Sequence, residues 1–193
     1  MKRIAVFASG SGTNAEKIIH YFKNSKSIKI VALMSNNSNS FALERARRNQ
    51  IPTAVFSNDD FKTGTDIHNL LDHLEVDFIV LAGFLRMIPK ILLDAFPNRI
   101  INIHPALLPD YGGKGMYGTS VHEKVIRNGE KKSGISIHLV NEFYDEGHIL
   151  FQAFCPILKN DTAESLAEKI HQLEHEHFPI VIEDWVLNSE EED

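Results

Sequence analysis

Short apolar runs alternate along the chain with amphipathic segments of helical length. The apolar runs predict strands at Ile4–Ala8, Ile28–Met34, Ile51–Phe56, Phe78–Ala82 and Arg99–His104, and the segments between them predict helices at Ala15–Phe22, Phe41–Gln50, Thr65–Leu74 and Pro89–Phe96. Runs without a polar face are typical of strands that are buried on both sides in a parallel sheet. The alternation therefore predicts a parallel sheet with right-handed crossovers.

The C-terminal third of the chain follows a different pattern. A helix is predicted at Ser120–Asn128, two strands at Ser133–Val140 and His148–Pro156 with the loop Asn141–Gly147 between them, a long helix after the capping segment Asp161–Glu164, and a solvated tail at Glu190–Asp193. A short connection pairs neighbouring strands in antiparallel fashion. We expect one α/β domain, residues 1–193, in three layers: a mostly parallel central sheet with an antiparallel C-terminal strand pair, covered by helices.

The strand at residues 99–104 carries two polar residues on one face. Because strand side chains alternate, Asn102 and His104 share one side and Ile101 and Ile103 the other. Pro105 ends the strand, and ligands bind at the carboxyl ends of strands in open α/β sheets. An amide that can stabilise an oxyanion would thus lie beside an imidazole that can carry a proton. The alternative is an Asn that caps a turn beside a hydrogen-bonded core His.

A glycine-rich loop, Ser9–Asn14, follows the first predicted strand and precedes the first helix. Backbone N–H groups and the positive end of the helix dipole make such a loop an anion site. A dinucleotide site would also need an acidic residue at the end of the second strand, but Ser35–Ser40 contains none. We therefore expect a monophosphate to bind here; the alternative is a plain turn between strand and helix.

Two further segments belong near the same edge of the sheet. The apolar run Phe84–Ile88 follows the most clearly buried strand, and it is predicted either to wall a pocket for a flat ring or to be ordinary core. The segment Asp110–Gly118 contains four glycines and is predicted to be a mobile loop, able to act as a lid.

Composition narrows the classes of function. The net charge of −6 argues against a broad electrostatic grip on nucleic acid, and no apolar stretch of about 18 residues predicts a membrane span. One cysteine, Cys155, allows no internal disulfide, so we expect a cytoplasmic protein. His171 and His175 are four residues apart without the His-Glu-x-x-His pattern, and we expect no metal site.

Four motifs in this order resemble one family: Ser9–Asn14, Leu81–Arg86, Asn102–Pro109 and Asp145–Gly147. The chain closely resembles the phosphoribosylglycinamide formyltransferases (glycinamide ribonucleotide transformylases), which use folate in purine synthesis, over nearly its whole length. The resemblance implies the formyltransferase fold, a Rossmann-like three-layer sandwich. It also implies two small-molecule partners, phosphoribosylglycinamide and the formyl donor 10-formyltetrahydrofolate, and a monomer or homodimer.

The resemblance assigns roles to individual residues. It implies that Asn102, His104 and Asp145 are catalytic. It also implies that the substrate phosphate is bound by Gly12, Thr13 and Asn14, and the glycinamide end by His171 and Glu174. The folate would be bound by Leu85, Arg86, Met87, Ile88, Asn102, Asn141, Glu142, Phe143, Tyr144 and Asp145, and its tail by Lys62. No metal takes part in the implied reaction.

The expected chemistry is direct attack of the glycinamide amine on the formyl carbon. Asn102 would stabilise the oxyanion, and a protonated His104 would support departure of the folate nitrogen. We expect the charge of Asp145 to outweigh burial and raise the pKa of His104. The alternatives are another formyltransferase or a hydrolase that uses 10-formyltetrahydrofolate, and a non-catalytic phosphate-binding module.

Overall fold

The structure is built on one seven-stranded sheet. A computed structural model of the chain describes residues 1–189; the predicted tail at 190–193 lies outside them. The strands are β1 (Lys2–Phe7), β2 (Ile28–Ser35), β3 (Thr53–Val55), β4 (Phe78–Leu81), β5 (Ile100–His104), β6 (Lys132–Leu139) and β7 (Ile149–Pro156), in the spatial order β3-β2-β1-β4-β5-β6-β7. The first five strands are parallel, and β6 and β7 are antiparallel, which confirms the predicted sheet.

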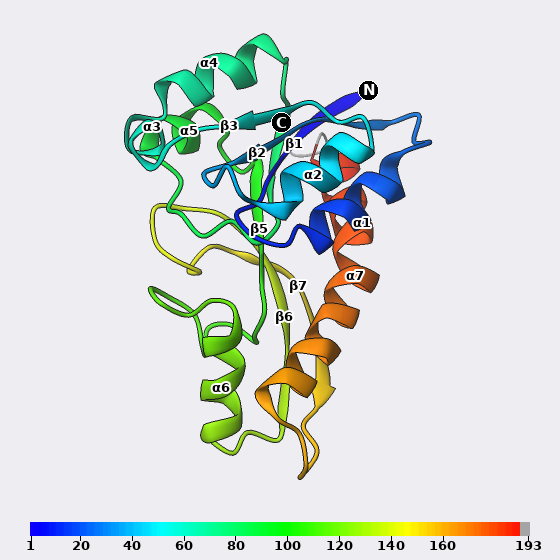
Figure 1. Cartoon of the computed structure of the whole chain (residues 1–193), viewed down its shortest axis with the longest axis vertical. Coiled ribbons are helices and arrows are strands. Elements are labelled where there is room, and N and C mark those ends of the chain that lie inside the picture. Colours follow the sequence, from blue (N-terminus) through cyan, green and yellow to red (C-terminus); the bar gives the residue numbers. More distant parts are fainter. Residues whose placement is uncertain (190–193) are drawn as a thin grey trace.

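Helices cover both faces of the sheet and make a three-layer fold (Figure 1). They are α1 (Thr13–Phe22), α2 (Phe41–Arg48), α3 (Asn58–Thr63), α4 (Thr65–His73), α5 (Lys90–Ala95), α6 (Thr119–Arg127) and α7 (Ala163–Asn188). One hydrophobic core joins α1, α2, α6 and α7 to the sheet, and the second joins α3, α4 and α5 to the opposite face. Within residues 1–189, no helix is long and apolar enough to cross a membrane.

The sequence-based description of the region after β2 needs correction at two points. The strand predicted at Ile51–Phe56 is only three residues long, because Gln50 turns left-handed (φ 61°) and the Ile51 N–H still bonds to the α2 carbonyl of Ala46. Helix α3 was not predicted at all. Ser57 starts it with a reciprocal capping box, in which the side chains of Ser57 and Asp60 each accept a backbone N–H of the other.

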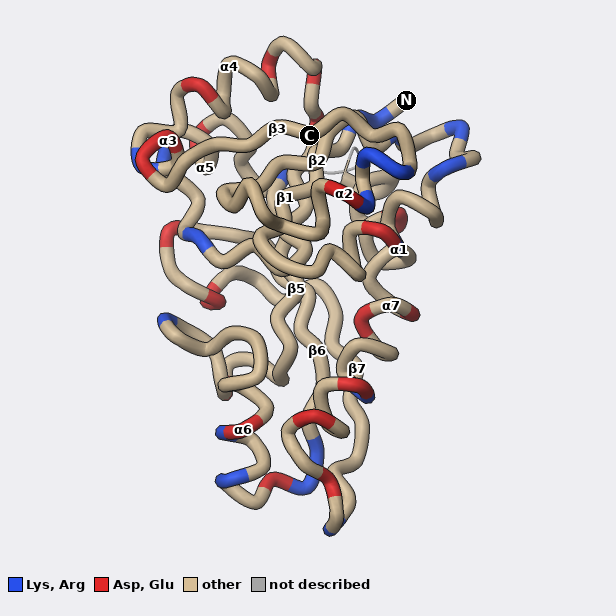
Figure 2. The backbone as a smooth tube through the Cα atoms, viewed as in Figure 1, with Lys and Arg blue, Asp and Glu red and all other residues tan. Residues whose placement is uncertain are grey.

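Charged side chains lie mostly away from the centre of the sheet. Figure 2 shows basic and acidic residues interspersed over the outer helices and loops, with the middle of β5 and β6 free of Lys, Arg, Asp and Glu. The polar residues that do occur on these central strands need partners from the facing strand or from the loops that cover them.

A buried hydroxyl clamps the loop that follows β5. Ser136 on β6 is fully buried; its Oγ donates to the Ala106 carbonyl (2.8 Å) and accepts from the Leu108 N–H (2.9 Å) and from Gln152 Nε2 (2.8 Å). Gln152 also donates to the Leu108 carbonyl at 3.0 Å. One side chain thus satisfies backbone groups on both sides of Leu107 and fixes how the chain leaves the strand that carries His104.

Replacing Ser136 by Ala tests this clamp. The change leaves the buried N–H of Leu108 and the carbonyl of Ala106 without this partner, and we expect the free energy of unfolding to fall by roughly 2–3 kcal/mol. Urea unfolding followed by circular dichroism measures the difference. Ser27→Ala, at an exposed serine, is the control and should change stability by less than about 0.5 kcal/mol. Equal effects of the two substitutions would contradict the clamp.

Candidate active site

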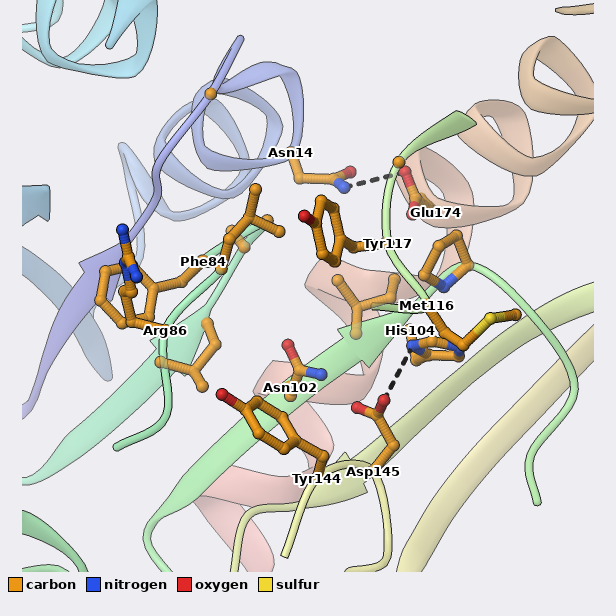
Figure 3. A pocket seen from close by; sticks show the side chains of 18 of the residues that line it. Asn14, Phe84, Arg86, Asn102, His104, Met116, Tyr117, Tyr144, Asp145 and Glu174 are labelled. Carbon is orange, nitrogen blue, oxygen red and sulfur yellow. Dashed lines mark hydrogen bonds and ion pairs between the residues drawn. The ribbon is translucent and has the colours of Figure 1, made fainter. Parts of the chain in front are cut away.

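The site is a cavity of about 600 Å³ at the carboxyl ends of β1, β4 and β5. Its lining brings together predicted site residues from five separate segments, namely Gly12, Thr13 and Asn14; Leu85 to Ile88; Asn102 and His104; Asn141, Phe143, Tyr144 and Asp145; and His171 and Glu174. Figure 3 shows Asn102 beside the His104–Asp145 pair, with the Asn14–Glu174 pair above both in this view. Residues that lie far apart in the sequence are thus brought together at the carboxyl ends of these strands.

The register of β5 against β6 places four polar side chains together. Asn102 lies opposite His138, and His104 lies opposite Ser136, so all four point to the same face of the sheet. The Asn102 amide nitrogen is 3.1 Å from His138 Nε2, and His138 Nδ1 is 2.8 Å from the Leu139 carbonyl oxygen. His138 is 2% exposed, so these contacts occur away from water.

Each ring nitrogen of His104 faces an oxygen atom. Its Nε2 is 2.8 Å from the Tyr111 carbonyl oxygen, and its Nδ1 is 3.5 Å from Asp145 Oδ2. A carbonyl only accepts a hydrogen bond, so Nε2 carries the proton in the neutral ring. The Nδ1 of neutral His104 therefore has a lone pair that faces the carboxylate of Asp145.

Burial controls the charge of His104, and this corrects the sequence-based expectation. The ring is 3% exposed, and burial lowers the pKa of His104 below its ordinary value, although the charge of Asp145 and the bond to Tyr111 act to raise it. The expectation that the charge of Asp145 would outweigh burial was therefore wrong. The sequence placed a carboxylate near the ring but did not show how completely the following loop would cover it.

Asp145 is fixed by a backbone hydrogen bond and lies beside two imidazoles. Its Oδ2 accepts the Gly113 N–H at 2.9 Å, and its Oδ1 lies 3.6 Å from His138 Nε2. Burial alone would raise the pKa of Asp145, but His138, the charge of His104 and the Gly113 N–H together lower it. The carboxylate is therefore ionised at neutral pH. Asp145 and Tyr111, which contact the two nitrogens of His104, both have a left-handed backbone (φ 58° each).

The glycine-rich loop has a structural reason for one of its glycines. Gly12 has φ +74°, and a Cβ there would lie 2.4 Å from the Cα of Ala42 on α2. Helix α1 begins directly afterwards without a side-chain cap, so its first N–H groups lack intrahelical partners. Arg45 donates to the Ser11 carbonyl, and its charge is paired with Glu16 in the first turn of α1.

The opposite side of the cavity is lined by α1, α6 and α7. Asn14 donates to the buried Glu174 at 2.9 Å; burial raises the pKa of Glu174, against the Asn14 amide and the charge of His171. His122 on α6 is also buried, and burial lowers its pKa to about 4, helped by the charges of His171 and His104. Within residues 1–189, no group of His, Cys, Asp and Glu side chains is arranged to hold a metal ion.

The comparisons with known proteins agree on one family. The family model described as formyl transferase matches residues 2–182. A phosphoribosylglycinamide formyltransferase of Haemophilus influenzae is 36% identical over 94% of this chain and 86% of its own length. The chloroplastic phosphoribosylglycinamide formyltransferase of Arabidopsis thaliana is 43% identical over 94% of this chain, which spans 64% of that relative. The solved phosphoribosylglycinamide formyltransferase from Bacillus halodurans superposes with a TM-score of 0.88 at 34% identity, over 97% of each chain.

The chain belongs to the formyl transferase family. Two residues that the resemblance to this family assigned to folate, Lys62 and Glu142, do not line the cavity. Lys62 is exposed on α3 and pairs with Asp59 at 2.6 Å. The Lys and Arg side chains that do line the cavity are Arg86 and Lys114.

Sequence reasoning missed two histidines of this site. His138 and His122 both line the cavity. The signal for His138 was present, because Ser136 and His138 repeat on their strand the same alternate polar spacing as Asn102 and His104. No comparable signal marked His122, whose helix places it in the lining only through its packing against α7.

The titration of His104 tests the balance between burial and charge. We expect its midpoint, followed by NMR of the ring, to lie below the ordinary value of about 6.5. Asp145→Asn removes the opposing charge and should move the midpoint lower still. Asp110→Asn, which removes an exposed carboxylate from the same loop region, should leave it in place. A wild-type midpoint above 6.5, or one that Asp145→Asn does not move, would refute this balance.

Proposed function

We propose that this protein transfers the formyl group of 10-formyltetrahydrofolate to the amine of phosphoribosylglycinamide, a step of purine synthesis. The observation that carries the proposal is the convergence of Asn102, His104 and Asp145 on one cavity. A module that only binds phosphate has no use for an amide donor, an imidazole and an ionised carboxylate at one end of its pocket. The named relatives, at 36% and 43% identity, support the same assignment.

The glycine-rich loop is the proposed phosphate site. Free N–H groups at the start of α1 and the positive end of the helix dipole suit the phosphate of the ribonucleotide. From there the substrate extends past the pair of Asn14 and Glu174 and the nearby His171, so its amine reaches the Asn102 side of the cavity.

The apolar mouth of the cavity is the proposed folate site. Five large apolar side chains at the mouth are between 40% and 56% exposed, namely Leu85, Met87, Tyr117, Phe143 and Tyr144. Exposed apolar groups gathered at one pocket suit a flat ring system. Arg86 and Lys114 are the lining cations suited to the acidic folate tail, in place of Lys62, which does not line the cavity.

The reaction follows from the resting state of the site. The amine attacks the formyl carbon, and an N–H of Asn102 donates to the oxygen as it becomes negative, an interaction typically worth about 3–4 kcal/mol in the transition state. Neutral His104 takes up the proton that the amine loses, and the ionised Asp145 stabilises the imidazolium that forms. The proton then passes to the folate nitrogen as its bond to the formyl carbon breaks. The His104–Asp145 pair ends the cycle with its starting charge.

The remaining parts of the proposal concern the whole protein. It needs the formyl donor as co-substrate and no metal, and it binds neither nucleic acid nor a membrane. It acts as a single-domain monomer or homodimer in the cytoplasm. Among the named relatives, the Arabidopsis protein is chloroplastic.

A turnover assay tests the function. We expect 10-formyltetrahydrofolate to lose its formyl group rapidly only when phosphoribosylglycinamide is present, with formation of the formylated amine in equal amount. The absorbance of the folate follows loss of the formyl group, and mass spectrometry follows formation of the formylated amine. Rapid turnover with water as the acceptor would indicate a hydrolase, and binding of the ribonucleotide without turnover would indicate a binding module.

A carboxylate placed in the glycine-rich loop tests the phosphate site. Thr13→Glu puts a negative charge at the first residue of α1, where a carboxylate favours the helix but repels a phosphate. We expect KM for phosphoribosylglycinamide to rise about tenfold or more, as one lost charge-assisted contact would give, while KM for the folate stays within about twofold. Thr13→Val is the matched control. Gly12 is unsuitable because any side chain there meets Ala42. Equal KM values in the two variants would remove the loop from the site.

A further inference from the structure

His138 has a specific task that neither the sequence nor the family assignment gave it. We infer that His138 is a positioning residue: it accepts one N–H of the Asn102 amide and thereby aims the other N–H at the formyl oxygen. The inference rests on the proposed function for its catalytic consequence, but the geometry of His138 stands on its own contacts. It faces Asn102 from the opposite strand and Asp145 from the following loop.

The Leu139 carbonyl determines which ring nitrogen of His138 carries the proton. Its oxygen lies 2.8 Å from His138 Nδ1 and only accepts, so Nδ1 carries the proton of the neutral ring. The other nitrogen, Nε2, is then an acceptor. The nitrogen of the Asn102 side chain lies 3.1 Å from it and donates. A backbone carbonyl thus selects the tautomer of a histidine, and the histidine selects which end of the Asn102 amide faces β6.

The opposite tautomer would place like groups against each other. With its proton on Nε2, the ring would present a donor to the donor of Asn102 and a lone pair to the Leu139 carbonyl. Turning the Asn102 amide around would relieve only the first conflict and would withdraw its N–H groups from the β6 side. The charged and titratable groups that face the ring are Asp145, 3.6 Å away through Oδ1, and His104 beyond it. The contacts with the two uncharged partners are shorter than the contact with Asp145.

The absence of a side chain at Gly147 leaves room for the Leu139 carbonyl, which sets the tautomer of His138. A Cβ at Gly147 would lie 1.7 Å from the Leu139 oxygen and 3.5 Å from His138 Nδ1. Any other residue must push that carbonyl aside, because a backbone atom cannot swing away as a flexible side chain does. The glycine of the Asp145–Gly147 segment therefore protects the contact that orients His138, two residues after the carboxylate that serves the chemistry.

The consequence concerns Asn102 as an oxyanion donor. Its amide nitrogen has two hydrogens, and one is committed to His138. The second remains for the cavity, which Asn102 lines. A side-chain amide that rotates freely would present its oxygen as often as its nitrogen, and an oxygen would repel the developing charge. His138 removes this alternative before the substrate binds.

The ring tautomer is measured directly by nitrogen NMR of the wild-type protein at neutral pH, without substrate. We expect His138 to carry its proton on Nδ1, and His104 to carry its proton on Nε2. The single variants His138→Gln and His104→Gln assign the signals. A proton on Nε2 of neutral His138 overturns the inference, whether or not the protein transfers a formyl group.

Kinetics test the positioning role. His138→Leu should lower kcat about 10- to 100-fold, below the full loss of an oxyanion donor, with both KM values within about twofold. His138→Gln, which offers an amide oxygen near the place of Nε2, should recover kcat to within about fivefold of wild type. His148→Leu removes a neighbouring imidazole that does not line the cavity and should leave kcat unchanged.

A double variant separates positioning from a structural effect. In the Asn102→Ala background, His138→Leu should lower the residual kcat by less than about twofold, because the group that it orients is already gone. Full multiplication of the two losses overturns the inference, as does a Gln variant no better than Leu. Absence of formyl transfer by the wild-type protein would refute the proposed function and leave the tautomer measurement to decide on His138.

Discussion

The antiparallel pairing of β5 with β6 is the constraint on which the rest of the site depends. Its register sets Asn102 opposite His138 and His104 opposite Ser136, so four polar side chains share one face of an otherwise apolar sheet. A shift by one residue would turn all of them toward the core formed with α1 and α7, where Ile101 and Ile103 now pack. The buried isoleucines thus hold the polar face in register.

Backbone carbonyls then decide the proton positions on this face. Tyr111 and Leu139 each present a carbonyl to one nitrogen of a buried histidine, and both rings leave their other nitrogen toward Asp145. Burial keeps His104 neutral at rest by lowering its pKa. In the proposed reaction, the carboxylate therefore has a different effect from the one that proximity alone suggests, because it would stabilise a cation that forms during the transfer rather than one that is present beforehand.

The sequence predicted those parts of the site that depend on one element. Strand alternation placed Asn102 and His104 together, and a strand, glycines and a helix start marked the loop before α1. Asp145 came from the family resemblance, because its position depends on a loop that returns to β5 through a left-handed residue. The pKa direction of His104 depends on how deeply the segment after Pro105 covers it. Periodicity carries no information about such coverage.

Most polar groups this deep in a protein have a hydrogen-bond partner, and the internal bonds of this site decide which groups stay available to a substrate. In the resting site His138 and Asn102 satisfy each other, and His104 bonds to Tyr111. Asn102 keeps one N–H for the cavity, and two other lining atoms within residues 1–189, Asn14 Oδ1 and His122 Nδ1, are buried without a hydrogen-bond partner. In the proposed formyl transfer, the free N–H of Asn102 is the donor that the oxyanion requires.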